Sequence, residues 1–216
     1  EKRARLVVFP ESVILGWENP EAHTRAFPVP GEDSDRLCRL AAQYGVYLCI
    51  GLDEKEGDRL FDSAILIDDQ GKILLKHRKV NVLPELMDPP YSSGNMEVKT
   101  TETKFGKIGL LICADAFVDS LVEGMAAQKP DLLLIPFGWA APETAWPQHG
   151  QSLHDLVKKV AQKVNCPLVG VDLTGQISHG PWRGQVYGGQ SIAYYPLTGR
   201  SILANDRDRD IVVFSF

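Results

Sequence analysis

Short apolar runs alternate with longer amphipathic segments along the chain. The runs are rich in Val, Ile and Leu and are bounded by Gly, Pro or charged residues, which is typical of buried strands. They predict strands at residues 5–9, 46–50, 107–112, 131–135, 167–171 and 211–214, with Pro136 ending the fourth of these. Leu37, Leu40 and Ala41 share one face of a helix predicted at 33–44, capped by Asp33 or Ser34. Two more helices are predicted at 118–128 and 152–164.

Two hairpins interrupt this alternation. Residues 63–67 and 73–75 flank a turn at 68–71, and residues 191–195 and 201–204 flank a turn at 196–199. A short turn joins only antiparallel neighbours, so the sheet cannot be purely parallel. Buried strands beside amphipathic helices predict a mixed-sheet α/β fold, and the absence of a linker or repeat predicts a single domain over residues 1–216.

Composition narrows the class of protein. The chain has 216 residues, of which 44% are hydrophobic and 24% charged, and this excludes a wholly disordered chain. A formal net charge of −5 argues against a broad basic face for nucleic acid. No apolar run reaches the roughly 18 residues of a membrane span. The four cysteines lack CxxC spacing, which favours reduced thiols and a cytoplasmic location.

Three reactive side chains each follow an apolar run that is predicted to be a strand. They are Glu11, Lys79 and Cys113. Ligands collect beyond the carboxyl ends of strands in helix-covered sheets, so residues distant in sequence can meet there. Taken singly, each has an ordinary structural explanation: a lone cysteine is usually inert, Glu11 can simply begin a loop, and Lys79 lies in a basic stretch typical of solvated faces.

Together, however, the three blocks resemble the signatures of one family. Residues 6–11, 77–80 and 109–115 are similar, in order and spacing, to the three signature blocks of the nitrilase, or carbon–nitrogen hydrolase, superfamily. The segment 132–136 with Trp139, and residues 189–191, resemble its downstream blocks. The resemblance implies an αββα sandwich of two mixed sheets flanked by helices. The superfamily normally opens with another strand and helix before the glutamate, so we expect a fold lacking them, in a chain that is incomplete or trimmed.

The resemblance also implies roles for the three residues. Cys113 would be the nucleophile, Glu11 the general base and acid, and Lys79 the group that stabilises the tetrahedral intermediate. The backbone N–H of Ala114 would be a second donor to the oxyanion. A thiol with a pKa near ~8.5 is mostly protonated at neutral pH, so a neighbouring base is needed to form the thiolate. Asp115 is expected to support the turn through backbone hydrogen bonds and not to react.

Other site residues are assigned with alternatives open. Glu85 is the first candidate for the second glutamate that family members often carry, with Glu97 behind it, and a plain solvated carboxylate is an equal alternative for Glu85. Trp139 is a candidate for lining the acyl pocket, although an aromatic residue after a strand is as often core. Tyr91 lies in a loop that could shape the mouth of the site.

The sequence therefore predicts a thiol-dependent amidohydrolase that cleaves a non-peptide C–N bond of a small amide or carbamoyl compound, with no cofactor and no metal. Residues 114–117 differ from the Trp-Glu-His pattern resembling true nitrilases, which favours amides over nitriles. Nitrile hydrolysis, acyl transfer to an amine, and a non-catalytic metabolite-binding relative are the alternatives. The resemblance also implies a homodimer or a higher homo-oligomer, and we expect neither a nucleic-acid nor a membrane partner.

Overall fold

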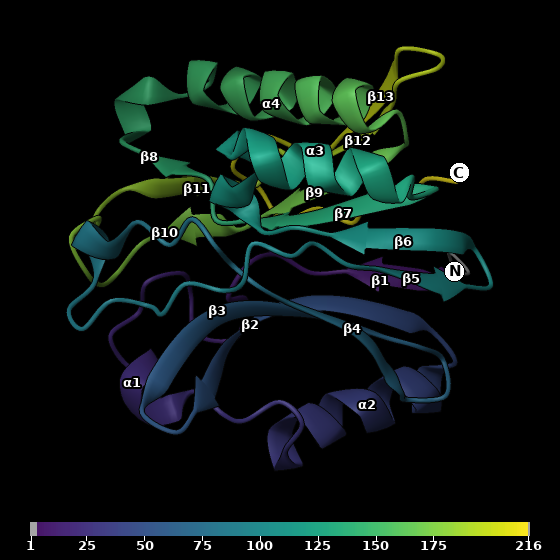
Figure 1. Cartoon of the computed structure of the whole chain (residues 1–216). Helices are drawn as coiled ribbons and strands as arrows, with labels where there is room; N and C mark the ends of the chain where they lie inside the picture. Colours follow the sequence, from purple (N-terminus) through teal and green to yellow (C-terminus); the bar gives the residue numbers. More distant parts are fainter. Residues whose placement is uncertain (1–3, 216) are drawn as a thin grey trace.

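The first sheet of the protein holds four strands and is covered on its outer face by one helix. The structure, a computed structural model, describes residues 4–215 (Figure 1). The sheet runs in the order β1 (Leu6–Val8), β2 (Tyr47–Glu56), β3 (Arg59–Ile67) and β4 (Ile73–Arg78). Strand β1 is parallel to β2, and the other pairs are antiparallel. Helix α2 (Glu32–Tyr44) covers the outer face, and the short helix α1 (Ala22–Arg25) lies beside it.

The second sheet holds six strands and is covered by two helices. Its order is β13 (Arg200–Leu203), β12 (Ile192–Tyr195), β9 (Leu168–Asp172), β7 (Leu132–Phe137), β6 (Gly106–Leu110) and β5 (Thr100–Thr103). Strands β6, β7 and β9 are parallel, and the outer pairs are antiparallel. Helices α3 (Asp119–Gln128) and α4 (Gln148–Val164) pack on its outer face (Figure 1).

Smaller elements lie in the connections between these layers. A three-stranded sheet has the order β10 (Thr174–Gln176), β11 (Val186–Gly188) and β8 (Ala140–Ala141). Three 3₁₀ turns are η1 (Pro84–Leu86), η2 (Cys113–Phe117) and η3 (Glu143–Ala145). The second of these directly follows the end of β6 and carries the cysteine singled out above.

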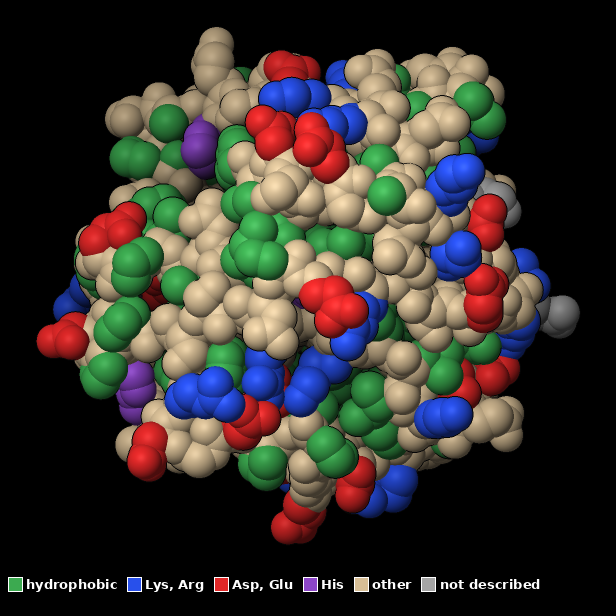
Figure 2. Space-filling model, viewed as in Figure 1, with side chains coloured by type: hydrophobic (Ala, Val, Ile, Leu, Met, Phe, Trp, Pro, Cys, Tyr) green, Lys and Arg blue, Asp and Glu red, His purple; other side chains and the backbone are tan. Residues whose placement is uncertain are grey.

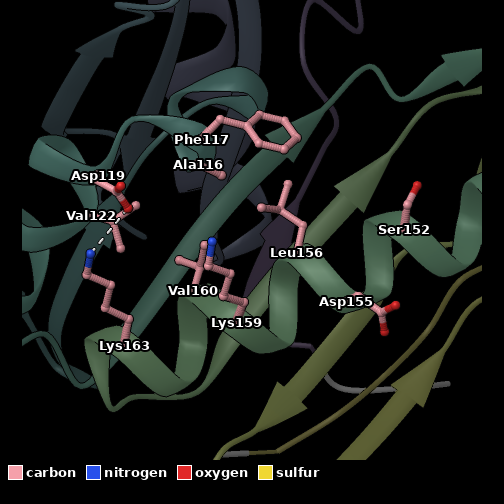
Figure 3. Close-up of a pocket in the computed structure, with 10 residues that line it drawn as sticks. All are labelled: Ala116, Phe117, Asp119, Val122, Ser152, Asp155, Leu156, Lys159, Val160 and Lys163. Atoms are coloured by element: carbon pink, nitrogen blue, oxygen red, sulfur yellow. Dashed lines mark hydrogen bonds and ion pairs between the residues drawn. The ribbon is translucent and has the colours of Figure 1, made fainter.

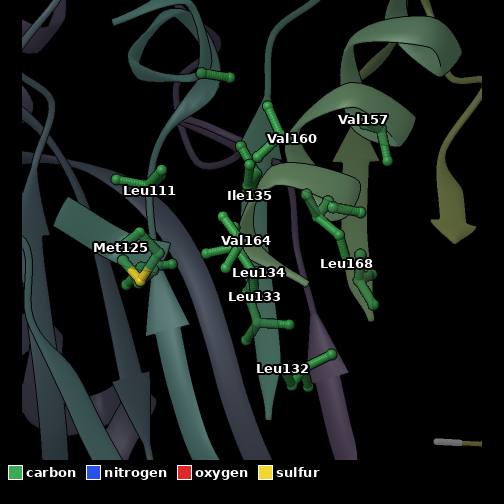
Figure 4. Packing of buried hydrophobic residues seen from close by; sticks show 14 of the residues in the cluster. Leu111, Met125, Leu132, Leu133, Leu134, Ile135, Val157, Val160, Val164 and Leu168 are labelled. Carbon is green, nitrogen blue, oxygen red and sulfur yellow. The ribbon is translucent and has the colours of Figure 1, made fainter. Parts of the chain in front are cut away.

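The two large sheets face one another, so the layers run helix, sheet, sheet, helix (Figure 1). Strand β2 is buried on both faces: Tyr47 and Cys49 point to the other sheet, whereas Leu48, Ile50 and Leu52 pack under α2. On the far side, β7 residues 132–135 pack against Val157, Val160 and Val164 of α4 and Met125 of α3 (Figure 4). The predicted αββα fold is confirmed.

Several boundaries differ from the prediction at helix α2. The helix begins at Glu32, so its N-cap is Gly31 and neither Asp33 nor Ser34. The Ser34 hydroxyl, three residues into the helix, accepts a hydrogen bond from the Gly31 N–H at 2.8 Å. The predicted face was also partly wrong, because Leu40 is exposed while Ala41 packs in the core.

The strand predictions need three corrections. Pro136 lies inside β7, opposite Val171 of β9, and does not end the strand. The hairpin of β2 and β3 and the hairpin of β5 and β6 were both missed. Residues 211–214 form no strand, because none of the strands within residues 4–215 pairs with them and a strand is defined by its ladder partner.

The surface carries charges of both signs. On the face drawn in Figure 2, acidic and basic side chains are interspersed, with hydrophobic side chains between them. Within the described part of the chain, no helix combines the length and apolar character that crossing a membrane requires.

Candidate active site

The three predicted reactive residues come together where the two large sheets meet. Glu11 lies just beyond β1 and Lys79 just beyond β4, both in the first sheet, while Cys113 begins η2 after β6 of the second sheet. The Lys79 ammonium donates a hydrogen bond to Glu11 Oε1. The Cys113 thiol interacts electrostatically with both Glu11 and Lys79. Folding thus places an acid, an ammonium and a thiol in one cluster.

This cluster is almost completely withdrawn from water. Glu11 and Lys79 are buried, and Cys113 retains 6% of its surface exposed. Burial raises the pKa of the Cys113 thiol well above its usual value, the Glu11 carboxylate adds to the rise, and the Lys79 ammonium opposes it. Burial alone lowers the pKa of Lys79, but the Glu11 and Asp62 carboxylates outweigh it and hold that pKa well above the ordinary value. Lys79 therefore stays a cation, as stabilisation of an oxyanion requires.

Cys113 occupies a strained backbone conformation. Its φ is +39°, in the left-handed region that residues with a Cβ seldom adopt. Such strain costs of order 1–3 kcal/mol and persists only where the surroundings hold it. The turn aims the thiol toward the meeting point of the sheets. Ala114, the next residue, lies in the first turn of η2, where backbone N–H groups have no partner within the helix. Its role as an oxyanion donor stays a prediction.

Asp115 holds this turn against the strand that carries Lys79. Its Oδ1 accepts hydrogen bonds from the backbone N–H groups of Val80 (2.9 Å) and Asn81 (3.0 Å). Its Oδ2 accepts from the Ile112 N–H (3.3 Å) and lies 2.8 Å from Nε2 of His77, which must carry the proton because a carboxylate only accepts. The structural role predicted for Asp115 is confirmed. The Asp115 carboxylate thus fixes the turn that begins at Cys113 relative to the residues that follow Lys79.

Gly138 closes the site from β7. Its backbone N–H lowers the pKa of the Cys113 thiol and so favours the thiolate. A Cβ at this position would lie 2.9 Å from Oε2 of Glu11 and 3.1 Å from Cβ of Trp17, so only glycine fits without moving the Glu11 carboxyl. Trp17 itself lies with its ring 5.2 Å from the Lys79 ammonium, a cation–π contact that covers the lysine. The sequence analysis singled out neither residue.

The candidates for a second glutamate lie at the surface. Glu85 is exposed in η1, and its charge contributes to raising the pKa of the buried Glu18 carboxyl. Glu97 is exposed and pairs with Lys99 at 3.3 Å. Neither Glu85 nor Glu97 is the second carboxyl that pairs with the Lys79 ammonium beside Glu11. That carboxyl belongs to Asp62, whose Oδ2 lies 3.2 Å from the Lys79 ammonium. The role of Glu85 stays a prediction.

The two aromatic candidates lie in different surroundings. Trp139 follows Gly138 and stacks between the rings of Phe117 (5.9 Å) and His149 (5.1 Å). Its backbone N–H donates to Oδ1 of the buried Asp172 at 2.6 Å. Tyr91 is buried, and its hydroxyl donates to Asp53 Oδ1 at 2.6 Å. The structure thus places Trp139 beside the Gly138 turn and Tyr91 inside a packed cluster, and their roles as pocket residues stay predictions.

All four cysteines are free, and no group of three His, Cys, Asp or Glu side chains within residues 4–215 has an arrangement that could hold a metal ion. The cluster of Glu11, Lys79 and Cys113 can transfer a proton between thiol and carboxyl, present a thiolate to a carbonyl carbon, and stabilise the resulting oxyanion with Lys79.

Comparison with solved structures supports the fold. The fold matches that of an amidase from Nesterenkonia sp. with a TM-score of 0.76 and 23% identity, covering 95% of this chain and 75% of the amidase. A variant of that amidase, which carries the acetamide moiety of fluoroacetamide covalently at its active site cysteine, matches with a TM-score of 0.74 and 23% identity over 92% of this chain and 72% of the variant. At this identity the likeness concerns the fold.

Sequence comparison gives the family. The family model described as carbon–nitrogen hydrolase matches residues 1–213, and the chain belongs to this family, in the nitrilase superfamily. A bifunctional nitrilase/nitrile hydratase of Lupinus angustifolius is 31% identical over 155 residues, which are 62% of this chain and 43% of that protein. A probable nitrilase of Schizosaccharomyces pombe is 29% identical over 177 residues, which are 79% of this chain and 61% of the yeast protein. The chain spans less than half the length of such plant relatives.

The Asp115 contacts predict a stability effect. Asp115→Asn replaces one acceptor oxygen with an NH₂ group that faces N–H donors, so we expect the free energy of unfolding to fall by about 3 kcal/mol. Urea denaturation measures it. Asp119→Asn is the matched control, because that carboxylate is exposed at the start of α3. An Asp115→Asn chain as stable as wild type would show that the four contacts do not hold the turn.

The close approach at Gly138 predicts an effect on thiol reactivity. In Gly138→Ala the new Cβ displaces the Glu11 carboxyl and the Gly138 N–H, so we expect alkylation of Cys113 by iodoacetamide at neutral pH to slow by about 10-fold or more. Gly124→Ala in α3 is the control, because its Cβ meets a single methyl group of Val98. Equal alkylation rates in Gly138→Ala and wild type would contradict the tight fit around the base.

Proposed function

We propose that the protein is a thiol-dependent amidohydrolase that cleaves a non-peptide C–N bond of a small amide or carbamoyl compound. One observation carries the proposal: the buried Lys79 ammonium contacts the Glu11 carboxylate, and the Cys113 thiol is within electrostatic reach of both. Membership of the carbon–nitrogen hydrolase family supports it.

The first half of the reaction forms an acyl-enzyme. Glu11 takes the proton of the Cys113 thiol, and the thiolate sulfur bonds to the carbonyl carbon while the C=O electron pair moves to oxygen. The Lys79 ammonium and the Ala114 N–H stabilise that oxyanion. When the oxyanion collapses, the C–N bond breaks and Glu11 returns its proton to the departing amine. The product is a thioester on Cys113.

The second half releases the acid. Glu11, again a carboxylate, removes a proton from a water molecule, and the hydroxide adds to the thioester carbon. Collapse of this second intermediate breaks the C–S bond, and the proton on Glu11 returns to the sulfur. The same carboxyl thus acts as base, acid, base and acid in turn, and no cofactor takes part in any step of the proposed cycle.

Nitriles are the second candidate substrates. The plant relatives and the yeast relative are named as nitrilases, whereas the solved neighbours are named as amidases. The residues after the nucleophile, Ala-Asp-Ala-Phe at 114–117, favour amides. Matched amide and nitrile pairs with the same acyl group separate the two, and added hydroxylamine detects acyl transfer to an amine.

We further propose that the protein forms a homodimer through the groove between α3 and α4. This groove has a volume of about 320 Å³ and is lined by apolar and charged side chains from both helices (Figure 3). Lys163 pairs with Asp119 across it, and Phe117 at its rim is 58% exposed. Figure 2 shows acidic and basic side chains next to each other over these helices at the top of the view. A surface that carries both signs can pair with a copy of itself, as a two-fold interface requires.

Loss of the thiol tests the reaction. We expect Cys113→Ala to lower amide hydrolysis by at least about 10³-fold, because no acyl-enzyme can form. Intact-mass analysis with small amides such as fluoroacetamide is expected to find an adduct on wild type and none on Cys113→Ala. Cys38→Ala is the matched control, since Cys38 is a partly exposed thiol outside the cluster. Full turnover in Cys113→Ala would refute the mechanism.

Light scattering tests the homodimer. We expect a mass of twice 23.9 kDa for wild type and a shift toward monomer for Phe117→Asp, because a charge at the rim of the groove opposes burial there. Leu197→Asp is the control: Leu197 is 86% exposed in the turn between β12 and β13, far along the chain from the groove. A monomer mass for the wild-type chain would reject the dimer.

A further inference from the structure

Asp62 is a buried carboxyl in the cluster to which no role has yet been given. It lies in β3, and its side chain is completely buried. Its Oδ2 is 3.2 Å from the Lys79 ammonium, and its backbone carbonyl accepts a hydrogen bond from the Lys79 N–H at 2.8 Å. Lys79 is thus held by Asp62 through both its backbone and its side chain, and its ammonium lies between two carboxyls.

The charges of this cluster do not balance if both carboxyls are ionised. Glu11 and Asp62 together would carry two negative charges against the single positive charge of Lys79, in a site without water contact. Two carboxylates that share a buried site do not both ionise readily. Apart from the ion-pair contact with Lys79 and the contact with the Glu11 carboxyl, neither oxygen of Asp62 has a partner among the described residues, so the Asp62 carboxyl can carry a proton.

The other groups around Asp62 favour the same outcome. Burial raises the pKa of Asp62 well above its usual value, the Glu11 charge and hydrogen bonding to Glu11 add to the rise, and Lys79 opposes it. Further titratable groups lie within electrostatic reach. They are Asp53, whose pKa burial raises to about 7, Glu18, whose pKa burial raises to about 8, and the buried hydroxyl of Tyr91. None of these three adds a positive charge, so the sum of the neighbours disfavours an ionised Asp62.

We propose that Asp62 is a positioning residue of the active site: it fixes the Lys79 ammonium, holds the extra proton of the carboxyl pair at neutral pH, and releases it in competition with the Cys113 thiol at alkaline pH. This inference rests on the proposed roles of Glu11, Lys79 and Cys113. While Asp62 is neutral, Glu11 is the carboxylate of the pair and is available as the base. Once Asp62 ionises, its charge partly cancels that of Lys79 and opposes formation of the thiolate.

The experiment follows the ionisation of Cys113 without any substrate. The rate of Cys113 alkylation by iodoacetamide, read by intact mass and peptide mapping, is measured from pH 6 to pH 11 in wild type, Asp62→Asn and Asp58→Asn. In Asp62→Asn the amide oxygen still accepts from Lys79 but cannot ionise. We expect its profile to follow a single ionisation with half-maximal rate about one pH unit below that of wild type, since the carboxylate that competes with the thiolate for the Lys79 charge has been removed. Asp58 is exposed in the β2–β3 turn, and Asp58→Asn is expected to match wild type.

In the wild-type chain the profile is expected to depart from a single ionisation, because Asp62 and Cys113 both ionise within electrostatic reach of Lys79 and Glu11. A single-ionisation curve for wild type would overturn the proposal whatever the variants do. So would an Asp62→Asn profile that coincides with wild type, which is the result expected of a purely structural residue. Asp62→Ala serves as the second variant and is expected to show the same downward shift.

Failure of this proposal is distinguishable from failure of the proposed function. Alkylation needs no turnover, so a chain that hydrolyses no amide still reports whether Asp62 and Cys113 share their protons. Conversely, amide hydrolysis can depend on Cys113 while the alkylation profiles of wild type and Asp62→Asn coincide. That result would support the proposed hydrolase function and contradict the role of Asp62.

Discussion

A single buried ammonium, that of Lys79, imposes the strictest constraint on this structure. A charge withdrawn from water is tolerated only when it is paired, and removing one partner of a buried pair costs about 3–5 kcal/mol. Lys79 meets the condition through Glu11 and Asp62, and the Trp17 ring covers it. These partners come from different parts of the first sheet, so the ends of its strands must lie where the ammonium requires them.

The Cys113 thiol comes from the other sheet, and a second carboxylate, that of Asp115, fixes its position relative to Lys79. The cysteine turn is strained, with a positive φ at Cys113, and Asp115 holds it by accepting hydrogen bonds from both sides. Its bonds to His77, Val80 and Asn81 reach the segment that carries Lys79. One carboxylate therefore both stabilises the strained turn and sets the position of the thiol relative to the ammonium. Stability and reactivity depend on the same contacts here.

Much of this arrangement could be predicted from the sequence, because strand ends are visible as polar residues after apolar runs. Glu11, Lys79 and Cys113 were found in that way. Elements that depend on tertiary contacts were not. Pro136 lacks a backbone N–H and was therefore predicted to end a strand, yet β7 continues past it beside β9. Gly138 carries no signal in the sequence, since its importance lies in the space that Glu11 and Trp17 leave for it.

Asp62 shows how a β-bulge hides a residue that contacts Lys79. The hairpin of β3 and β4 was predicted. Next to its turn, Ile67 pairs with Ile73. A bulge then shifts the register by one residue, so that Leu66 faces Leu75 and Ser63 faces Arg78. One residue beyond the Ser63–Arg78 pair, the shifted register places Asp62 opposite Lys79. Without the bulge, the pairing of Ile67 with Ile73 would place Asp62 opposite Arg78 instead. A shift of one residue changes which face a side chain points to, and a bulge is not predictable from alternation alone.

The cluster holds more acids than cations, and this excess bears on its chemistry. Asp53 and Glu18, with pKa values raised by burial to about 7 and about 8, lie within electrostatic reach of Asp62, which itself contacts Lys79. A buried carboxyl that lacks a cation retains a proton, because burial disfavours the charged form. Hydrolysis through a thiol requires that a proton leave sulfur, reach the amine and later leave water, and a surplus of buried carboxyls around one ammonium suits that sequence better than a neutral ion pair would.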